Sequence, residues 1–335
     1  MNDQQVFSEK GPSSESPRLD EPVRIFVGAH ATEKLPLQVL AYSIRRHTAL
    51  DVSVRTIDNT LVPVPSDPRF LPYTNFSYGR FAIPKQAGFQ GRAVYMDSDM
   101  LVFRDIAEIW GMPFEGAKIL VEKVTDQTRG SGRLTAVMMM DCAALRWEPA
   151  EIVSRLGVDY DYNALMSILP LLEDGYLQDR LPVGWNSLDE YSEETRLLHY
   201  TKIKTQPWVY PAHPLGSLWI DEVKRMLAEG TLSADTVRDE VTQGHVRPSI
   251  LPELGLAGEK SPEYWTTKKL LRYDKRSGFV VHEKLIADMN AKEKARREHG
   301  RETDPKRYWR DRRRRMWRNF YRHPVSFFTQ EKLRW

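Results

Sequence analysis

The sequence predicts an α/β fold, and three observations lead to this expectation. Strand-like runs of Val, Ile, Phe, Leu and Met alternate with segments whose apolar residues recur at helical spacing. The first such elements form a β-α-β unit, which is how a doubly wound sheet begins. The chain has 335 residues, 41% of them hydrophobic, which is enough to bury a sizeable core.

The opening β-α-β unit comes from residues 23–57. A buried strand is expected over 23–29 and a second strand over 52–57, with a helix between them that has Pro36 in its first turn. Further strands are predicted over 92–96, 100–103, 119–124, 135–140 and 196–200. Helices are predicted over 78–83, ended by Pro84, and over 149–156, 162–172 and 214–229, the last closed by Gly230 at C′.

Composition divides the chain into four parts. Residues 1–22 are polar and are expected to form a disordered leader, 23–230 a catalytic domain, 231–302 a helical appendage and 303–335 a basic, aromatic tail. The single cysteine, Cys142, excludes an intramolecular disulfide and any Cys-cluster metal site. No run of about 18 apolar residues or secretory signal is present, so we expect a cytoplasmic protein or one that faces the cytosol.

Two carboxylates one residue apart, Asp97 and Asp99, interrupt the apolar run 93–103 at the end of a predicted strand. Burying such a pair without compensation would be costly, because like charges at close range resist ionising together. A divalent cation such as Mn²⁺ (or Mg²⁺) would remove that cost and leave positions open for substrate phosphates. The alternative is an acidic turn with both carboxylates in water.

A second strand-like run ends in His199 and is followed by Lys202, Lys204 and Gln206. A neutral imidazole could complete a metal shell and a lysine could neutralise a phosphate, although a lone histidine is more often satisfied by one hydrogen bond. Trp185 and Asn186 precede this run. They could face an acceptor, or serve in core packing and a turn.

The ordered combination of these motifs resembles glycosyltransferase family 8, which includes glycogenin and bacterial lipopolysaccharide galactosyl- and glucosyltransferases. The resemblance covers residues 23–210. It rests on Phe-Ser-Tyr-Gly-Arg at 76–80, Tyr-Met-Asp-Ser-Asp at 95–99 with Asp105, Ile106 and Trp110 after it, and His-Tyr at 199–200 with Gln-Pro-Trp at 206–208. It implies a GT-A (Rossmann-like) nucleotide-diphospho-sugar transferase fold with a mixed central sheet, a UDP-sugar donor, bound Mn²⁺ and transfer with retention of configuration.

Site residues follow from the resemblance position by position. Asp97, Asp99 and His199 match the metal ligands, and Asp161 with Tyr162 falls where the family has a catalytic Asp-Gln-Asp segment beneath the donor sugar. Tyr162 replaces the family's glutamine, and Leu-Thr-Ala at 134–136 replaces the usual Asn-Ala-Gly. The resemblance and the charge pattern together give a donor-binding set of Gly28, His30, Arg80, Asp97, Ser98, Asp99, Lys202, Lys204 and Gln206.

Charge is distributed unevenly along the chain. Residues 306–335 hold 11 Lys and Arg against two acids, whereas residues 1–305 hold 38 bases and 44 acids. Arginines mixed with Trp, Phe and Tyr in a predicted helix starting at Thr303 and Pro305 are typical of an interfacial membrane anchor. We therefore expect the tail to meet an anionic membrane surface. Nucleic acid and an inert, solvated tail are the alternatives, of which nucleic acid is not favoured.

Together these observations predict a hexosyltransferase that is peripheral on the cytosolic face of a membrane. Its donor is a UDP-sugar and its acceptor a surface glycan or a lipopolysaccharide-like glycolipid. The alternatives are a catalytically degenerate GT-A protein that only binds nucleotide or metal, and a nucleic-acid-binding protein that acts through the basic tail.

Overall fold

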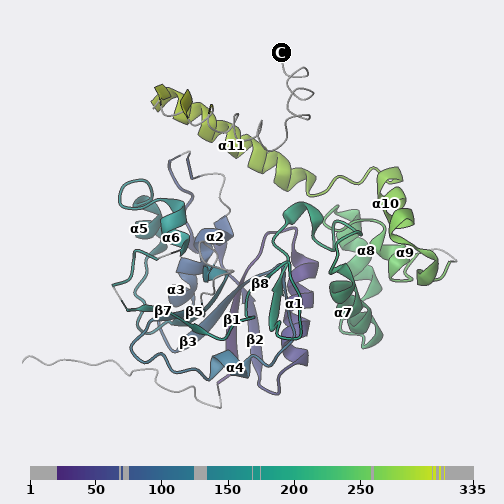
Figure 1. Ribbon diagram of the computed structural model, residues 1–335, viewed down its shortest axis with the longest axis horizontal. Coiled ribbons are helices and arrows are strands. Elements are labelled where there is room, and N and C mark those ends of the chain that lie inside the picture. The colour runs from purple at the N-terminus through teal and green to yellow at the C-terminus, as the bar shows by residue number, and fades with distance from the viewer. Residues whose placement is uncertain are drawn as a thin grey trace, which may run out of the picture. The chain divides into compact units, whose positions relative to one another are not determined.

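The computed structural model describes residues 21–67, 69–70, 75–123, 134–167, 169–173, 175–257, 260–303, 305–306, 309–310 and 313 (Figure 1). The chain divides into two compact units. The first consists of Met1–Pro63 and Asn75–Glu283, and the second of Val64–Thr74 and Lys284–Trp335. The boundaries expected near residues 22, 230 and 302 stay predictions.

A six-stranded sheet is the centre of the first unit, with the order β2-β1-β3-β6-β5-β7. The pairs β1–β2, β1–β3 and β5–β7 are parallel, and β3–β6 and β5–β6 are antiparallel. The α/β class and the mixed central sheet predicted from the sequence are confirmed. The strands are β1 (Val23–Gly28), β2 (Val52–Thr56), β3 (Arg92–Asp97), β5 (Ile119–Glu122), β6 (Val137–Asp141) and β7 (Leu177–Leu181).

The β-α-β opening forms as expected. Helix α1 (Lys34–Arg46) connects β1 to β2, with Pro36 in its first turn, where its missing N–H leaves no intrahelical hydrogen bond unmade. Its apolar stripe, including Val39 and Leu40, is fully buried. One side of α1 contacts β4, and another contacts α7 (Gly216–Ala228) in a core cluster that includes Trp219.

A second, three-stranded sheet has the order β4-β9-β8 and carries residues of the site. Strand β4 (Met100–Val102) follows β3 after a single turn and pairs antiparallel with β9 (Leu197–His199). In this register Met100 faces His199. Strand β8 (Ser187–Leu188) pairs parallel with the other edge of β9.

Short helices complete the first unit (Figure 1). Gly230, at φ +71°, follows α7 at the C′ position, as predicted. The remaining helices are α2 (Asn75–Gly79), α3 (Ile83–Gln86), α4 (Ala107–Trp110), α5 (Pro149–Ser154), α6 (Tyr162–Ser167), α8 (Ala234–Thr242), α9 (Ile250–Glu253) and α10 (Thr267–Arg276).

Several predicted boundaries are wrong for identifiable reasons. Pro84 does not end the helix over 78–83 but lies in the first turn of α3, where proline is tolerated. Helix α6 ends at Ser167 rather than at residue 172, and Leu169 has a positive φ of 45°. The strand expected over 135–140 begins at Val137, because Leu134–Ala136 forms a 3₁₀ turn.

The second unit contains helix α11 (Glu283–Thr303), and its described ion pairs include His299 Nε2 with Asp67 Oδ1 at 3.9 Å. Thr303 does not cap a new helix as predicted, since it is the last residue of α11 and its hydroxyl donates to the carbonyl of His299. Most of the predicted basic tail, 303–335, lies outside the described residues. Within the described residues, none of the helices combines the length and apolar character that crossing a bilayer requires.

Candidate metal centre

Three of the predicted ligands meet where the two sheets adjoin. Asp97 is the last residue of β3 and pairs with Gly28 at the end of β1, while Asp99 immediately precedes β4. His199 ends β9, opposite Met100. The β4–β9 register thus brings an imidazole from a distant part of the chain beside the Asp-x-Asp turn.

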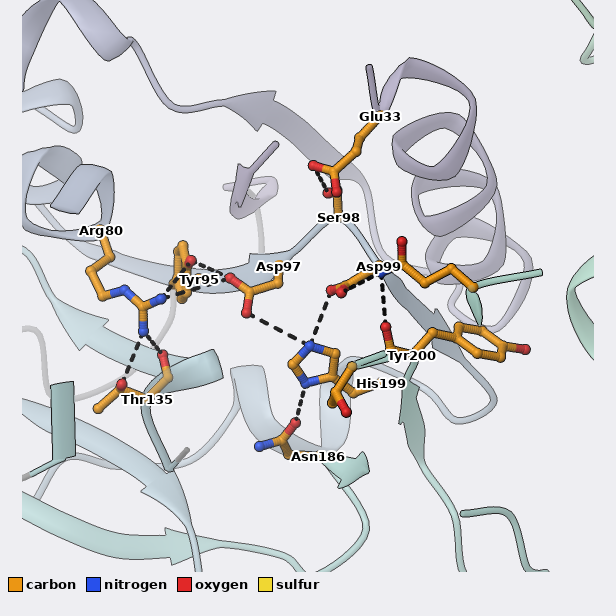
Figure 2. Close-up of polar contacts among 12 residues, drawn as sticks. Glu33, Arg80, Tyr95, Asp97, Ser98, Asp99, Thr135, Asn186, His199 and Tyr200 are labelled. Carbon is orange, nitrogen blue, oxygen red and sulfur yellow. Dashed lines mark hydrogen bonds and ion pairs between the residues drawn. The ribbon is translucent and has the colours of Figure 1, made fainter. Parts of the chain in front are cut away.

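The ligand atoms of Asp97, Asp99 and His199 all lie within 4.8 Å of one another (Figure 2). His199 Nε2 is 3.1 Å from Oδ1 of Asp99 and 3.8 Å from Oδ2 of Asp97. The histidine side chain is 8% exposed, and the two carboxylates are 15% and 16% exposed. The cluster is therefore largely shielded from bulk water, with the two carboxylates more exposed than the imidazole.

The geometry fits a divalent cation. Asp99 Oδ1 is buried and has no hydrogen-bond partner, although His199 Nε2 lies close by. Adjacent ligands of an octahedral ion with bonds of about 2.1 Å are separated by roughly 3 Å. The 3.1 Å between His199 Nε2 and Asp99 Oδ1 is close to that separation. Burial raises the pKa of Asp97, an effect that the positive charge of Arg80 opposes and that a bound cation would also oppose. Two carboxylates and one imidazole suit Mn²⁺ or Mg²⁺.

Arg80 is buried on the other side of Asp97. Its guanidinium donates to the carbonyl of Ser77 at 2.9 Å and to the carbonyl and hydroxyl of Thr135 at 2.6 and 2.9 Å. It also donates to the hydroxyl of Tyr95 at 3.1 Å, and that hydroxyl in turn donates to Asp97. Burial alone would lower the pKa of Arg80, but Tyr95 and Asp97 outweigh burial and raise it. A permanent positive charge is thus fixed 3.8 Å from the Asp97 carboxylate.

Gln206 orients the second carboxylate. Its side-chain amide donates to Oδ2 of Asp99 and to the carbonyl of Tyr200, both at 2.9 Å. The backbone N–H of Tyr200 donates to the carbonyl of Asp99. Gln206 is 1% exposed, and its Oε1 has no hydrogen-bond partner. The sequence placed Gln206 against the donor, whereas its amide N–H group contacts Asp99.

Glu33 is a carboxylate of this region that the sequence analysis did not identify. It lies just before α1 and accepts from the backbone N–H of His30 at 2.6 Å. It also accepts from the hydroxyl of Ser98 at 2.9 Å (Figure 2). Burial, followed by the negative charge of Asp99, raises the pKa of Glu33 to about 7. No motif marks it, and only its place after a strand-to-helix turn could have drawn attention to it.

The two predicted catalytic residues lie at the start of α6, Asp161 just before the helix and Tyr162 as its first residue. Asp161 is exposed and accepts from the N–H of Ala164, so it caps the start of this helix. Tyr162 packs edge-on against Tyr78, with ring centroids 5.8 Å apart, and it is one of the groups near Arg80 that raise the pKa of that guanidinium. The structure therefore brings Tyr162 near the Arg80 side of the site, and the described contacts do not join Asp161 to the metal cluster.

The other residues predicted to bind the donor differ in their burial and in their contacts. Gly28 accepts the backbone N–H of Ser98, whose side chain is 2% exposed and turned toward Glu33. The imidazole of His30 contacts the hydroxyl of Thr32 at 3.1 Å. Lys202 is 70% exposed and lies 3.7 Å from Asp189, while Lys204 is exposed in a 3₁₀ turn.

Comparisons with known proteins give distant similarities, and no protein-family model matches the chain. Protein CDI of Arabidopsis thaliana is 23% identical over 248 residues, which cover 65% of this chain and 92% of that protein. The apo form of the glycosyltransferase GlyE from Streptococcus pneumoniae TIGR4 is 14% identical, with a TM-score of 0.45 over 60% of each chain. The match thus spans less than two thirds of GlyE.

A structure of galactosyltransferase LgtC in complex with donor and acceptor sugar analogs is 14% identical, with a TM-score of 0.42. The match covers 59% of this chain and 94% of LgtC. Both solved structures are described as glycosyltransferases.

Proposed function

We propose that this chain is a metal-dependent glycosyltransferase of the family 8 type. It moves a hexose from a UDP-sugar to a surface glycan or a lipopolysaccharide-like glycolipid, with retention of configuration. The observation that carries the proposal is the convergence of Asp97, Asp99 and His199, with a buried Asp99 oxygen that lacks a hydrogen-bond partner. Burial of two carboxylates and an imidazole at a sheet edge is difficult to explain by folding stability alone.

The residues around the cluster have complementary roles in this proposal. Asp97, Asp99 and His199 would hold Mn²⁺ (or Mg²⁺), which when bound supplies positive charge to the departing diphosphate. Arg80 keeps a fixed positive charge on the Asp97 side, and its five contacts leave it little freedom to move. Gln206 holds the Asp99 carboxylate in one orientation.

Asp161 and Tyr162 are proposed for the sugar face of the donor. Departure of the diphosphate leaves positive charge on the anomeric carbon, and a carboxylate such as Asp161 would stabilise it. The exposed position of Asp161 at the start of α6 leaves it accessible to a sugar. Tyr162 lies near Arg80 and would contact the part of the donor between Asp161 and Arg80.

A degenerate GT-A protein that binds nucleotide without turnover is the second candidate. Asp161 favours it, because the carboxylate already accepts a backbone hydrogen bond and the described contacts do not connect it with the metal cluster. Association with an anionic membrane through 303–335, on the cytosolic face, remains part of the first proposal.

The test is a titration of UDP into the full-length chain with and without Mn²⁺. Asp97→Asn and Asp99→Asn should each abolish the Mn²⁺-dependent part of the binding, whereas Asp235→Asn, on an 87% exposed carboxylate of α8, should not. UDP release from a panel of UDP-hexoses, with a glycolipid extract as acceptor, then separates turnover from binding alone. If the wild-type chain binds UDP equally well with and without Mn²⁺, the metal-dependent assignment is wrong.

A further inference from the structure

The nitrogen of His199 that faces away from the cluster is held by Asn186. Asn186 is 5% exposed, and its side-chain oxygen lies 3.0 Å from Nδ1 of His199 (Figure 2). An amide oxygen can only accept a hydrogen bond, so with the amide in this orientation Nδ1 carries the proton. In the neutral ring the lone pair is then on Nε2, which is the nitrogen that faces Asp97 and Asp99.

The loop that carries Asn186 is itself fixed by a buried acid. Glu122, at the end of β5 and 6% exposed, accepts the backbone N–H of Gly184 at 2.6 Å and also the backbone N–H of Asn186. The carbonyl of Gly184 accepts from the N–H groups of Arg196 and Leu197 at 2.9 and 2.8 Å, at the start of β9. The loop is therefore tied at one side to β5 and at the other to the strand that ends in His199.

The loop can adopt this path only because residue 184 is glycine. Gly184 has φ +96°, and a Cβ there would lie 2.5 Å from the carbonyl oxygen of Glu194. Trp185, which follows, is fully buried in the core cluster of the central sheet. The backbone around Asn186 is thus determined on both sides, so its side chain has a defined direction toward His199.

We infer that Asn186 is a positioning residue that fixes the Nδ1–H tautomer of His199 and thereby aims the Nε2 lone pair at the metal cluster, with Glu122 holding Asn186 through the loop 184–186. The inference deepens the proposed function and rests on it for the role of the metal. Sequence analysis placed Asn186 in a turn or against an acceptor, and the structure gives it this different contact.

The choice of an amide rather than a carboxylate has a physical consequence. A carboxylate at position 186 would also accept from Nδ1, but it would add a third negative charge around a histidine already beside two carboxylates. A neutral acceptor selects the tautomer without adding charge, which suits a ligand shared with two aspartates.

The experiment measures the tautomer in the metal-free protein. Proton–nitrogen correlation spectra of ¹⁵N-histidine-labelled full-length chain distinguish the Nδ1–H and Nε2–H forms. The chain has eight histidines, so His199→Gln identifies the signal. We expect Nδ1–H in the wild type, loss of its predominance in Asn186→Leu and its retention in Asn186→Asp at a pH where the ring is neutral. Asn290→Leu, at an exposed position of α11, is the matched control.

Mn²⁺ affinity of the same proteins provides the second readout. Asn186→Leu should bind Mn²⁺ about 10- to 100-fold more weakly than wild type, as expected when the outer partner of a ligating histidine is removed. Glu122→Gln, which retains one acceptor oxygen, should give a smaller loss of Mn²⁺ affinity. Asn290→Leu should leave the Mn²⁺ affinity unchanged. If Asn186→Leu does not fold, the tautomer and the Mn²⁺ affinity of Glu122→Gln and Asn186→Asp are compared with those of the wild type instead.

The two readouts separate the inference from the function on which it rests. An Nε2–H tautomer in wild type, or an unchanged tautomer in folded Asn186→Leu, overturns the positioning role. A wild-type chain that shows the Asn186-dependent Nδ1–H tautomer but does not bind Mn²⁺ supports that role and contradicts the proposed metal function.

Discussion

Met100 and His199 face each other across the antiparallel pair β4–β9, and this single register assembles the metal cluster. A shift of one residue would turn the side chain of His199 to the opposite face of the strand, because strand side chains alternate. The apolar pairs Leu101–Leu198 and Val102–Leu197 continue the same register with fully buried side chains. Core packing therefore determines where the imidazole lies.

Tyr95→Phe should destabilise the protein and weaken Mn²⁺ binding. The Tyr95 hydroxyl accepts from Arg80 and donates to Asp97, so its removal leaves a buried donor and acceptor unsatisfied. We expect a loss of about 1–3 kcal/mol in the free energy of unfolding, measured in urea. Tyr191→Phe, at a 46% exposed ring, is the control and should change stability by under about 0.5 kcal/mol.

Gly184→Ala should be more damaging than an ordinary glycine substitution. Gly244 also has a positive φ, of 74°, but a Cβ there meets nothing within 4 Å, so Gly244→Ala costs only the backbone strain, about 1–2 kcal/mol. At Gly184 the clash with the Glu194 carbonyl adds to that strain, and about 2–5 kcal/mol is expected in total. Equal losses for the two variants in urea denaturation would contradict the close approach.

Glu33→Gln should change how the stability of the metal-free protein depends on pH. The folded-state pKa of Glu33 is about 7, against an ordinary value of 4.5. The folded protein therefore holds this proton more tightly, and the associated stability is complete below pH 4.5 and lost as pH rises through 7.

With EDTA present, the wild type should lose up to about 3 kcal/mol between pH 4.5 and 7.5 relative to Glu33→Gln. Glutamine keeps an acceptor for His30 and Ser98, so the two proteins are comparable in contacts. Parallel pH profiles of the free energy of unfolding for the two proteins would show that Glu33 ionises normally.

Cys142 should resist thiol reagents in the native protein. Its side chain is fully buried after β6, and burial raises the pKa of the thiol to about 12. Because the thiolate is the reactive form, labelling at pH 8 should require unfolding and should follow the urea transition. Rapid labelling without denaturant would mean that the end of β6 opens in the folded state.

The sequence allowed the main parts of this site to be predicted. Asp97 and His199 end apolar strands, Asp99 immediately precedes one, and the apolar runs around them are long enough to be recognised. Arg80 also lies beside the cluster as the motif at 76–80 implied. These residues could be found because their positions follow from strand periodicity and from an ordered family pattern.

Other contacts could not be predicted, because they depend on which loops meet in three dimensions. Glu33 and Asn186 belong to no motif, and each acquires its partner only after distant strands pair. Thr303 followed by Asp-Pro has the pattern of a helix start, yet Thr303 is itself the last residue of α11.

The β4–β9 pairing also makes any bound ion a cross-link. Asp99 and His199 are separated by a long stretch of chain that includes β5, β6, β7 and β8, and strands β4 and β9 must pair before both residues can hold one cation. A cation bound only by the folded form would join the two ends of that stretch and stabilise the fold by mass action. The cation would then hold together the two ends of a long loop, and contacts between residues so far apart in the sequence form slowly. Binding of the cation would therefore indicate that folding is complete as well as that the site is ready for substrate.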